Sequence, residues 1–326
     1  MDIFINFVIL IVGFAALIKG ADWFVDGSSG IAKIFNVPGV IIGLTIVALG
    51  TSAPELAVST SAAINGSNEI ALSNVVGSNL FNTLIVLGVC AVIYKLPVDK
   101  DIIKRDMPLN LLVTIIMLVL TTIPLWTSNN ILNRKMNENV GEVSRIVGLI
   151  LLAIFIGYLI VLIRHAIKNP VEEKEGEKKP VWLCILLILI GVGLIVGGGE
   201  AVVHGAKNIA KAFGMSETLI GLTIVAFGTS LPELVTSVVA ATKKQTGMAV
   251  GNVIGSNLFN ILFILGLSST IHPIAVNMAS VFDMIILTVV AITVYLMSVR
   301  KHTISRGKGI ILILIYAADM VFAVMR

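Results

Sequence analysis

The chain has 326 residues, of which 57% are hydrophobic and only 13% are charged. Because soluble domains carry about 25% charged residues, this composition excludes an ordinary soluble protein and indicates one that spans a membrane. The formal net charge of +4 does not indicate a nucleic-acid-binding surface, because the basic residues lie at loop ends and not together on one soluble face.

Ten apolar stretches are candidates for membrane-spanning helices, which need about 20 mainly apolar residues. In chain order they are residues 3–19, 38–64, 70–94, 107–126, 146–163, 181–199, 218–242, 246–271, 284–299 and 309–324. Strong alternation of apolar and polar residues is absent, which favours helices over a β-barrel. The first stretch has no basic leader and no cleavage site, so we expect it to be a span and not a signal peptide.

The distribution of basic residues predicts the orientation of the chain. If the N-terminus lies outside, sixteen of the 23 lysines and arginines fall on the cytoplasmic side and six on the outer side, with Lys19 inside a span. The positive-inside rule therefore favours an outer N-terminus. The charged segment 168–180, bounded by prolines, is then a cytoplasmic linker.

A long segment of the sequence occurs twice. From about residue 21 to residue 88, similar residues recur without a gap at an offset of 178, so that Glu55 matches Glu233 and Gly50 matches Gly228. The chain is predicted to consist of two homologous halves, 1–167 and 181–326. Because each half contains five spans, corresponding helices must cross the membrane in opposite senses. We therefore expect an all-α membrane protein with ten transmembrane helices in two inverted five-helix repeats, a plan typical of secondary transporters.

The most chemically distinctive repeated segment is Gly-Thr-Ser-x-Pro-Glu, which ends at Glu55 and again at Glu233. A carboxylate at the centre of a bilayer costs roughly 2.5–3.5 kcal/mol on insertion scales. No lysine or arginine occurs in 38–94 or in 218–242. A bound cation or a proton is then the remaining way to neutralise these two acids.

Each glutamate follows a proline. Pro54 and Pro232 lack an N–H and would clash with the carbonyl groups of Gly50 and Gly228, four residues earlier. We therefore expect helices broken near 48–52 and 226–230. Free carbonyl groups in a membrane are tolerated where they line a cavity or bind a ligand.

A second repeated motif spans 73–82 and 251–260. Its serine and its last asparagine are one helical turn apart, which favours cation ligation by Ser78, Asn82, Ser256 and Asn260. The other amides, at Asn74, Asn79, Asn252 and Asn257, fit ligation and helix packing equally well.

All these candidate ligands are oxygen atoms, which suit Ca²⁺ and Na⁺ better than Zn²⁺ or Cu⁺. Two carboxylates balance one Ca²⁺ or two Na⁺. The two ions should therefore compete for one site, and competition at a site that faces each side in turn gives antiport.

Both copies of the motifs resemble the alpha-repeats of the Ca²⁺/cation antiporter superfamily, specifically its sodium/calcium exchanger branch. The resemblance implies Ca²⁺ ligation by Glu55 and Glu233 and by the backbone carbonyls of Thr51 and Thr229. It also implies Na⁺ ligation by the carbonyls of Ala48 and Ala226 and by the side chains of Ser52, Ser230, Ser78, Ser256, Asn82 and Asn260. Potassium-dependent members carry an aspartate at the position of Asn260, which argues against K⁺ coupling here. The large cytoplasmic regulatory loop of animal exchangers is missing.

The sequence thus predicts a Na⁺/Ca²⁺ antiporter of the cell (cytoplasmic) membrane. Its expected substrates are Na⁺ and Ca²⁺, and its expected surroundings are membrane lipid. Neither a cofactor nor an obligate protein partner is expected. An H⁺/Ca²⁺ antiporter that uses the same glutamates is the main alternative. A cation channel fits inverted halves and broken helices less well. An enzyme is not expected, because paired aspartates, an HExxH motif and a serine–histidine set were not found.

Overall fold

A computed structural model describes residues 3–66, 69–126, 135–136, 138–170, 179–215 and 226–325 of the chain. In the first half the helical segments are α1 (Ile3–Phe35), α2 (Gly39–Ile42), η1 (Gly43–Val47), α3 (Ala48–Thr51), α4 (Ala53–Ile64), α5 (Glu69–Phe81), η2 (Asn82–Val86), α6 (Leu87–Ile93), η3 (Ile102–Asp106), α7 (Met107–Trp126) and α8 (Arg145–Lys168). In the second half they are α9 (Val181–Ala212), α11 (Ala226–Gly228), α12 (Leu231–Thr242), α13 (Thr246–Phe259), η6 (Asn260–Leu265), α14 (Gly266–Ile271), α15 (Met278–Val299) and α16 (Arg306–Met325). The segments named η are π-helical and continue the α-helices beside them.

Within the described residues, seven helices are long and apolar enough to cross a membrane, and an eighth is present if the bent pair Gly39–Thr51 and Ala53–Ile64 counts as one span. Large apolar side chains on the outer helices, such as Phe4, Ile11, Ile150 and Leu296, are exposed, as lipid-facing residues would be. The chain is therefore a multi-pass membrane protein. The predicted span at 218–242 lies partly outside the described residues, so the count of ten stays a prediction.

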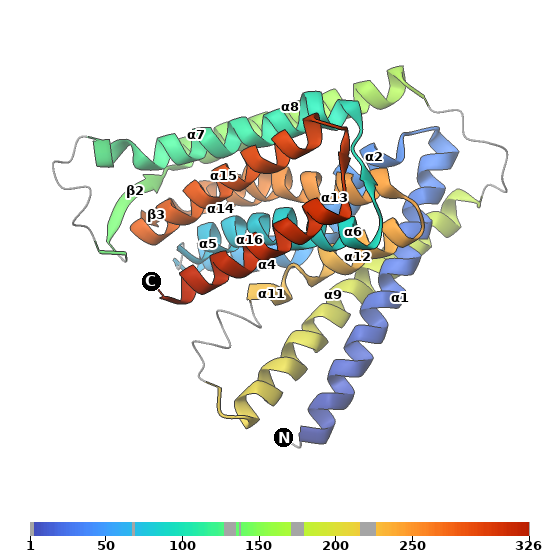
Figure 1. The fold of residues 1–326 in the computed structure, drawn as a ribbon, viewed down its shortest axis with the longest axis horizontal. Coiled ribbons are helices and arrows are strands. Elements are labelled where there is room, and N and C mark those ends of the chain that lie inside the picture. Colours follow the sequence, from blue (N-terminus) through green and yellow to red (C-terminus); the bar gives the residue numbers. More distant parts are fainter. Residues whose placement is uncertain are drawn as a thin grey trace.

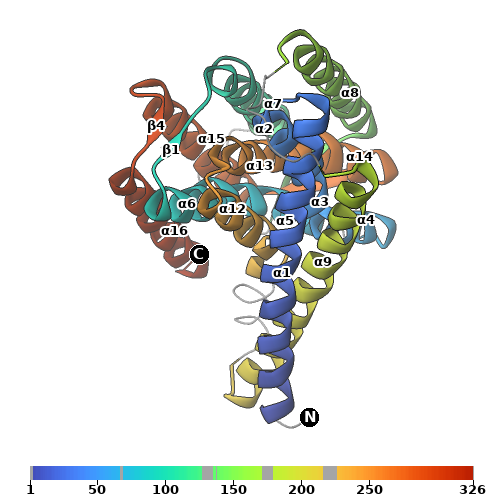
Figure 2. The same cartoon turned by 90° about the vertical axis from the view of Figure 1, so that its right-hand side faces the viewer.

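Two long helices, α1 and α9, lie side by side and extend away from the rest of the molecule (Figures 1 and 2). They have 33 and 32 residues, so the predicted ends at residues 19 and 199 are wrong. The prediction ended the first span at Lys19 and the second at Gly199, just before Glu200. In the structure, however, both helices continue for several further turns beyond the apolar stretch.

The contact between α1 and α9 depends on small residues. Glycines recur every seven residues, at 13, 20 and 27 in α1 and at 191, 198 and 205 in α9. A Cβ atom added to Gly20 would lie 2.8 Å from the carbonyl oxygen of Gly191, and one added to Gly198 would lie 2.8 Å from that of Gly13. The absence of side chains therefore lets the two backbones approach closely, as is usual for helix pairs in membranes.

The centre of the bundle is formed by α4, α5, α12 and α13, with α7, α8, α15 and α16 around them (Figure 1). The segment Thr246–Ile271 comprises α13, η6 and α14. In its most apolar stretch of 18 residues, 94% of the residues are buried. Cys90 and Cys184 are buried free thiols. The polar repeat motifs thus lie in the most enclosed part of the molecule.

Four short strands modify the all-α expectation: β1 (Leu96–Pro97), β2 (Asn139–Val143), β3 (Ile274–Asn277) and β4 (Thr303–Ile304). β1 pairs with β4 and β2 with β3, both antiparallel. Each two-stranded ribbon joins one half of the chain to the other, and the two ribbons lie at opposite ends of the molecule (Figures 1 and 2). Strands of two to five residues are too short for their alternation to be recognised in the sequence.

Candidate ion-binding site

The first copy of the proline motif breaks its helix where the sequence predicts. α3 ends at Thr51, α4 begins at Ala53, and the helix axis turns by 51° at Ser52. Pro54 therefore lies in the first turn of α4, where its missing N–H removes no helical hydrogen bond. In the second copy α11 ends at Gly228 and α12 begins at Leu231, with Pro232 in its first turn.

These breaks bring the two halves together around the two glutamates. Glu55 and Glu233 are both fully buried, with 0% of their surface exposed. The Ser52 hydroxyl donates to Glu233 Oε1 over 2.7 Å, and the Ser230 hydroxyl donates to Glu55 Oε1 over 2.9 Å. Each helix break thus provides a hydroxyl to the carboxylate of the opposite half.

The serines of the second motif complete this arrangement. Ser78 donates to Glu55 Oε1 over 3.3 Å, and Ser256 donates to Glu233 Oε1 over 3.5 Å. Ser230 also donates to the Ser78 hydroxyl over 3.1 Å. The structure therefore places six of the predicted ligands in two hydrogen-bonded groups, one around each glutamate. We call the two groups together the carboxylate cluster: Ser52, Glu55, Ser78, Ser230, Glu233 and Ser256.

Several polar atoms in and around the carboxylate cluster have no hydrogen-bond partner among the residues that the structure describes. They are Glu55 Oε2, Glu233 Oε2, both amide atoms of Asn82, Asn260 Oδ1 and the Thr229 hydroxyl. In the part of the chain that the structure describes, neither glutamate forms an ion pair with a lysine or arginine. A buried carboxylate oxygen without a partner is energetically costly, so the arrangement suits a bound cation.

The remaining predicted ligands take no part in these hydrogen bonds to the glutamates. Thr51 is fully buried, and its hydroxyl donates to Asn252 Oδ1 over 3.1 Å. Ala48 is buried one turn before it. Ala226 is the first residue of α11, and the structure does not describe its side chain. Asn260 donates to Asn79 Oδ1 over 3.0 Å.

The asparagines whose role the sequence leaves open connect helices. Asn79 donates to the carbonyl of Asn257 in the other half over 3.2 Å, and Asn257 donates to the Thr83 hydroxyl over 2.8 Å. Asn74 and Asn252 donate to Ser59 and Ser237, over 3.0 and 2.9 Å. Ser59 and Ser237 were not among the predicted site residues, although the offset of 178 relates them to each other as it relates the two asparagines.

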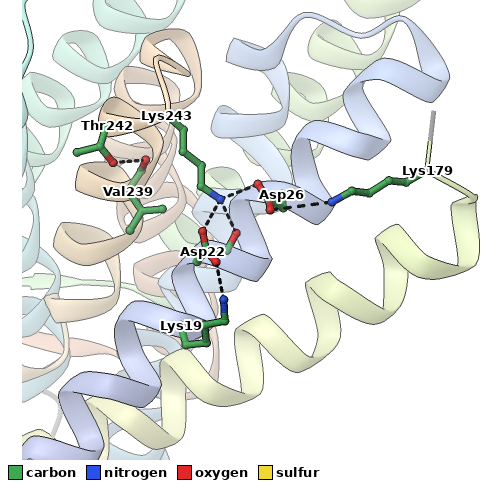
Figure 3. A network of polar contacts seen from close by, with 7 residues as sticks. All are labelled: Lys19, Asp22, Asp26, Lys179, Val239, Thr242 and Lys243. Carbon is green, nitrogen blue, oxygen red and sulfur yellow. Dashed lines mark hydrogen bonds and ion pairs between the residues drawn. The ribbon is translucent and has the colours of Figure 1, made fainter. Parts of the chain in front are cut away.

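A second group of charges connects α1 to the end of α12 (Figure 3). The Lys243 ammonium lies 2.6 Å from one carboxylate oxygen of Asp22 and 2.6 Å from one of Asp26. Lys19 pairs with Asp22 at 2.9 Å, and Lys179 lies 4.0 Å from Asp26. Partial burial favours the neutral form of Lys243, but the hydrogen bonds to Asp22 and Asp26 outweigh it and raise the pKa of this lysine above its usual value.

We expect Lys243→Gln to lower the free energy of unfolding by about 1 kcal/mol, because it leaves two neighbouring aspartates without their shared cation. Thermal unfolding of the purified protein in detergent measures this. Lys244→Gln is the matched control, since no described carboxylate pairs with Lys244. Equal stability of the two variants would show that the Lys243 contacts contribute nothing.

Comparison with known proteins agrees with this geometry. The family model described as "Sodium/calcium exchanger protein" matches residues 5–164 and 183–325. The sodium/calcium exchanger MaX1 of Methanosarcina acetivorans is 31% identical to this chain, and the match covers 97% of this chain and 98% of that protein. A membrane protein of Methanocaldococcus jannaschii, MJ0091, is 36% identical, with 94% of each chain covered.

Solved structures show the same fold. One structure of the sodium-calcium exchanger NCX_Mj superposes with a TM-score of 0.83 at 33% sequence identity, and it covers 100% of both chains. Together, the family match over both halves and this full-length similarity establish the family. The chain belongs to the sodium/calcium exchanger protein family.

Proposed function

We propose that the protein is a secondary active antiporter that exchanges Na⁺ for Ca²⁺ at a site formed by Glu55 and Glu233. The observation that carries this proposal is the carboxylate cluster. It contains one buried acid from each half, which accepts a hydrogen bond from a serine of the opposite half, and each acid keeps an oxygen without a partner in the described part of the chain. A bound cation stabilises such a cluster, because carboxylates that are buried without a cation are energetically costly.

In this proposal Ca²⁺ lies between the two carboxylates. Calcium takes 6–8 oxygen ligands, and two bidentate carboxylates with the backbone carbonyls of Thr51 and Thr229 supply that number. One Ca²⁺ neutralises both carboxylates, whereas two Na⁺ are needed for the same effect. Occupation by either ion therefore excludes the other, which couples their movements in opposite directions.

Sodium ions are assigned to the oxygens around the glutamates. The proposed Na⁺ ligands are Ser52, Ser78, Ser230, Ser256, Asn82, Asn260 and the carbonyls of Ala48 and Ala226. The hydroxyl oxygens of Ser52 and Ser230 lie within 3 Å of a carboxylate, and the amide atoms of Asn82 have no hydrogen-bond partner in the part of the chain that is described. A proton on a glutamate needs no such shell of oxygens. This difference supports Na⁺ coupling over H⁺ coupling.

Two features of the fold support two inverted five-helix repeats, 1–167 and 181–326, joined by the linker 168–180. α4 and α12 begin and end at residues related by the offset of 178. The ribbons pair strands of opposite halves in a reciprocal way, β1 with β4 and β2 with β3. In such a fold, alternating access exposes one central site to each side in turn. We place the protein in the cell membrane with its N-terminus outside and its linker in the cytoplasm.

Exchange by proteoliposomes tests the proposal. Vesicles loaded with Na⁺ and diluted into Na⁺-free medium with radioactive Ca²⁺ are expected to accumulate Ca²⁺. Vesicles with equal Na⁺ on both sides are expected not to. Uptake that follows a pH gradient and ignores Na⁺ would replace this proposal by H⁺/Ca²⁺ exchange at the same glutamates.

A further inference from the structure

Basic side chains converge on a hollow at the β1–β4 ribbon, which none of the carboxylate-cluster residues lines. Two adjoining depressions, of about 790 and 540 Å³, lie where α6 and α15 end and α16 begins. Figure 2 shows these elements together at one side of the molecule. We call the hollow with its five cationic residues the basic hollow: Lys95, Arg300, Lys301, Arg306 and Lys308.

The charges of the basic hollow are not neutralised within the described part of the chain. None of its five cationic residues forms an ion pair with a described aspartate or glutamate. Lys308 donates only to backbone carbonyls, those of Met297 and Thr303. Like charges gathered around one depression repel each other, so an anion bound among them relieves that repulsion.

Other groups at the basic hollow suit a phosphate. Thr303 and Ser305 provide hydroxyl groups in its wall. α16, a helix of 20 residues, begins at Arg306 directly after Ser305, so its first backbone N–H groups lie at the same place. Cationic side chains, hydroxyl groups and a helix N-terminus are the groups that commonly bind phosphate oxygens.

The repeat provides an internal comparison. Tyr94, Lys95 and Pro97 in the basic hollow correspond, by the offset of 178, to His272, Pro273 and Ala275. These three line a depression of about 650 Å³ beside the other ribbon, whose charged residues include Glu69 and Glu142 and no lysine or arginine. The fold alone therefore does not require cations at a ribbon.

The surroundings of the basic hollow point to a lipid. Exposed apolar side chains continue from its edge along the spans: Ile93 on α6, Val299 on α15, and Ile310 and Ile311 on α16. The basic residues lie on the face that the positive-inside rule assigns to the cytoplasm, where basic pockets between helices bind anionic headgroups. We propose that the basic hollow binds the phosphate headgroup of an anionic lipid, whose acyl chains lie along α6, α15 and α16. This site is separate from ion exchange and does not depend on it.

Native mass spectrometry of the purified full chain in detergent tests the site, with equal amounts of phosphatidylglycerol and phosphatidylcholine as probes. The wild type is expected to retain phosphatidylglycerol in preference. A triple variant with Lys95→Gln, Lys301→Gln and Arg306→Gln is expected to lose that preference by about 100-fold, since each cation near an anionic lipid contributes about fivefold.

The matched control removes three exposed basic residues predicted to face the same side but outside the hollow, through Lys100→Gln, Lys104→Gln and Lys168→Gln, and is expected to keep the preference. Equal losses in the two triple variants would overturn the site, because surface charge in general would then explain the binding. If the wild type shows no preference for phosphatidylglycerol over phosphatidylcholine, the proposed lipid site is wrong, whatever the variants show. If inorganic phosphate raises the thermal unfolding midpoint as much as phosphatidylglycerol does, the hollow takes free phosphate and the lipid assignment is wrong.

Discussion

Glu55→Gln and Glu233→Gln are each expected to abolish Na⁺-driven Ca²⁺ uptake. The amide has nearly the shape of the carboxylate, so the variants remove one negative charge with little change in packing. Loss of one negative charge about 4 Å from a divalent cation costs about 8 kcal/mol at the effective dielectric of a protein, so Ca²⁺ affinity falls by far more than a thousandfold. Uptake by proteoliposomes measures the effect.

Stability gives a second readout for the same variants. Each carboxylate of the wild type has a buried oxygen without a hydrogen-bond partner among the described residues, which a bound cation would satisfy. Added Ca²⁺ is expected to raise the unfolding midpoint of the wild type, by about 2.7 kcal/mol of stabilisation at a hundred times its dissociation constant, and to leave both variants unchanged. Glu69→Gln, which replaces an exposed carboxylate on α5, is the control and should behave like the wild type. A variant that still exchanges Ca²⁺ at the wild-type rate would contradict the assignment.

Ser52→Ala and Ser230→Ala are expected to weaken Na⁺ more than Ca²⁺. Each serine donates a hydrogen bond to the glutamate of the opposite half and offers its oxygen to Na⁺. Hydrogen bonds to charged groups contribute about 1.5–3 kcal/mol, so the half-saturating Na⁺ concentration should rise roughly ten- to a hundredfold. Ca²⁺ keeps both carboxylates and should lose much less affinity.

The measurement is the concentration of Na⁺ that halves Ca²⁺ binding, determined for each serine variant. Ser61→Ala is the control, because Ser61 lies on the exposed side of the same helix as Glu55. A parallel loss of Na⁺ and Ca²⁺ affinity would mean that the serines only position the carboxylates. Unchanged Na⁺ affinity with an altered pH dependence would favour the proton as the coupled ion.

The carboxylate cluster could be predicted from the sequence because its chemistry is repeated. A single acid after a proline in an apolar stretch is already energetically costly, and its recurrence at an offset of 178 predicts a function for both copies. The hydrogen bonds from Ser52 to Glu233 and from Ser230 to Glu55 could not be predicted. They depend on how the two halves pack, and the repeat pattern gives no information on that packing.

Other features escaped prediction for different physical reasons. α1 continues to Phe35 although it contains Asp22 and Asp26, because both carboxylates pair with Lys243, 217 residues away from Asp26 in the chain. Charged residues usually indicate the end of an apolar span, and only the tertiary partner shows that these do not. The two ribbons could not be predicted for the same reason, because each pairs strands that come from different halves of the chain.

The shared site is tested most directly by equilibrium Ca²⁺ binding to the purified protein in detergent, measured by calorimetry at a series of Na⁺ concentrations. The apparent dissociation constant for Ca²⁺ is expected to rise steadily with Na⁺ in the wild type, and the double variant Glu55→Gln with Glu233→Gln is expected to bind neither ion. Ca²⁺ binding that is indifferent to Na⁺, or that persists in the double variant, would contradict a common site between the two glutamates.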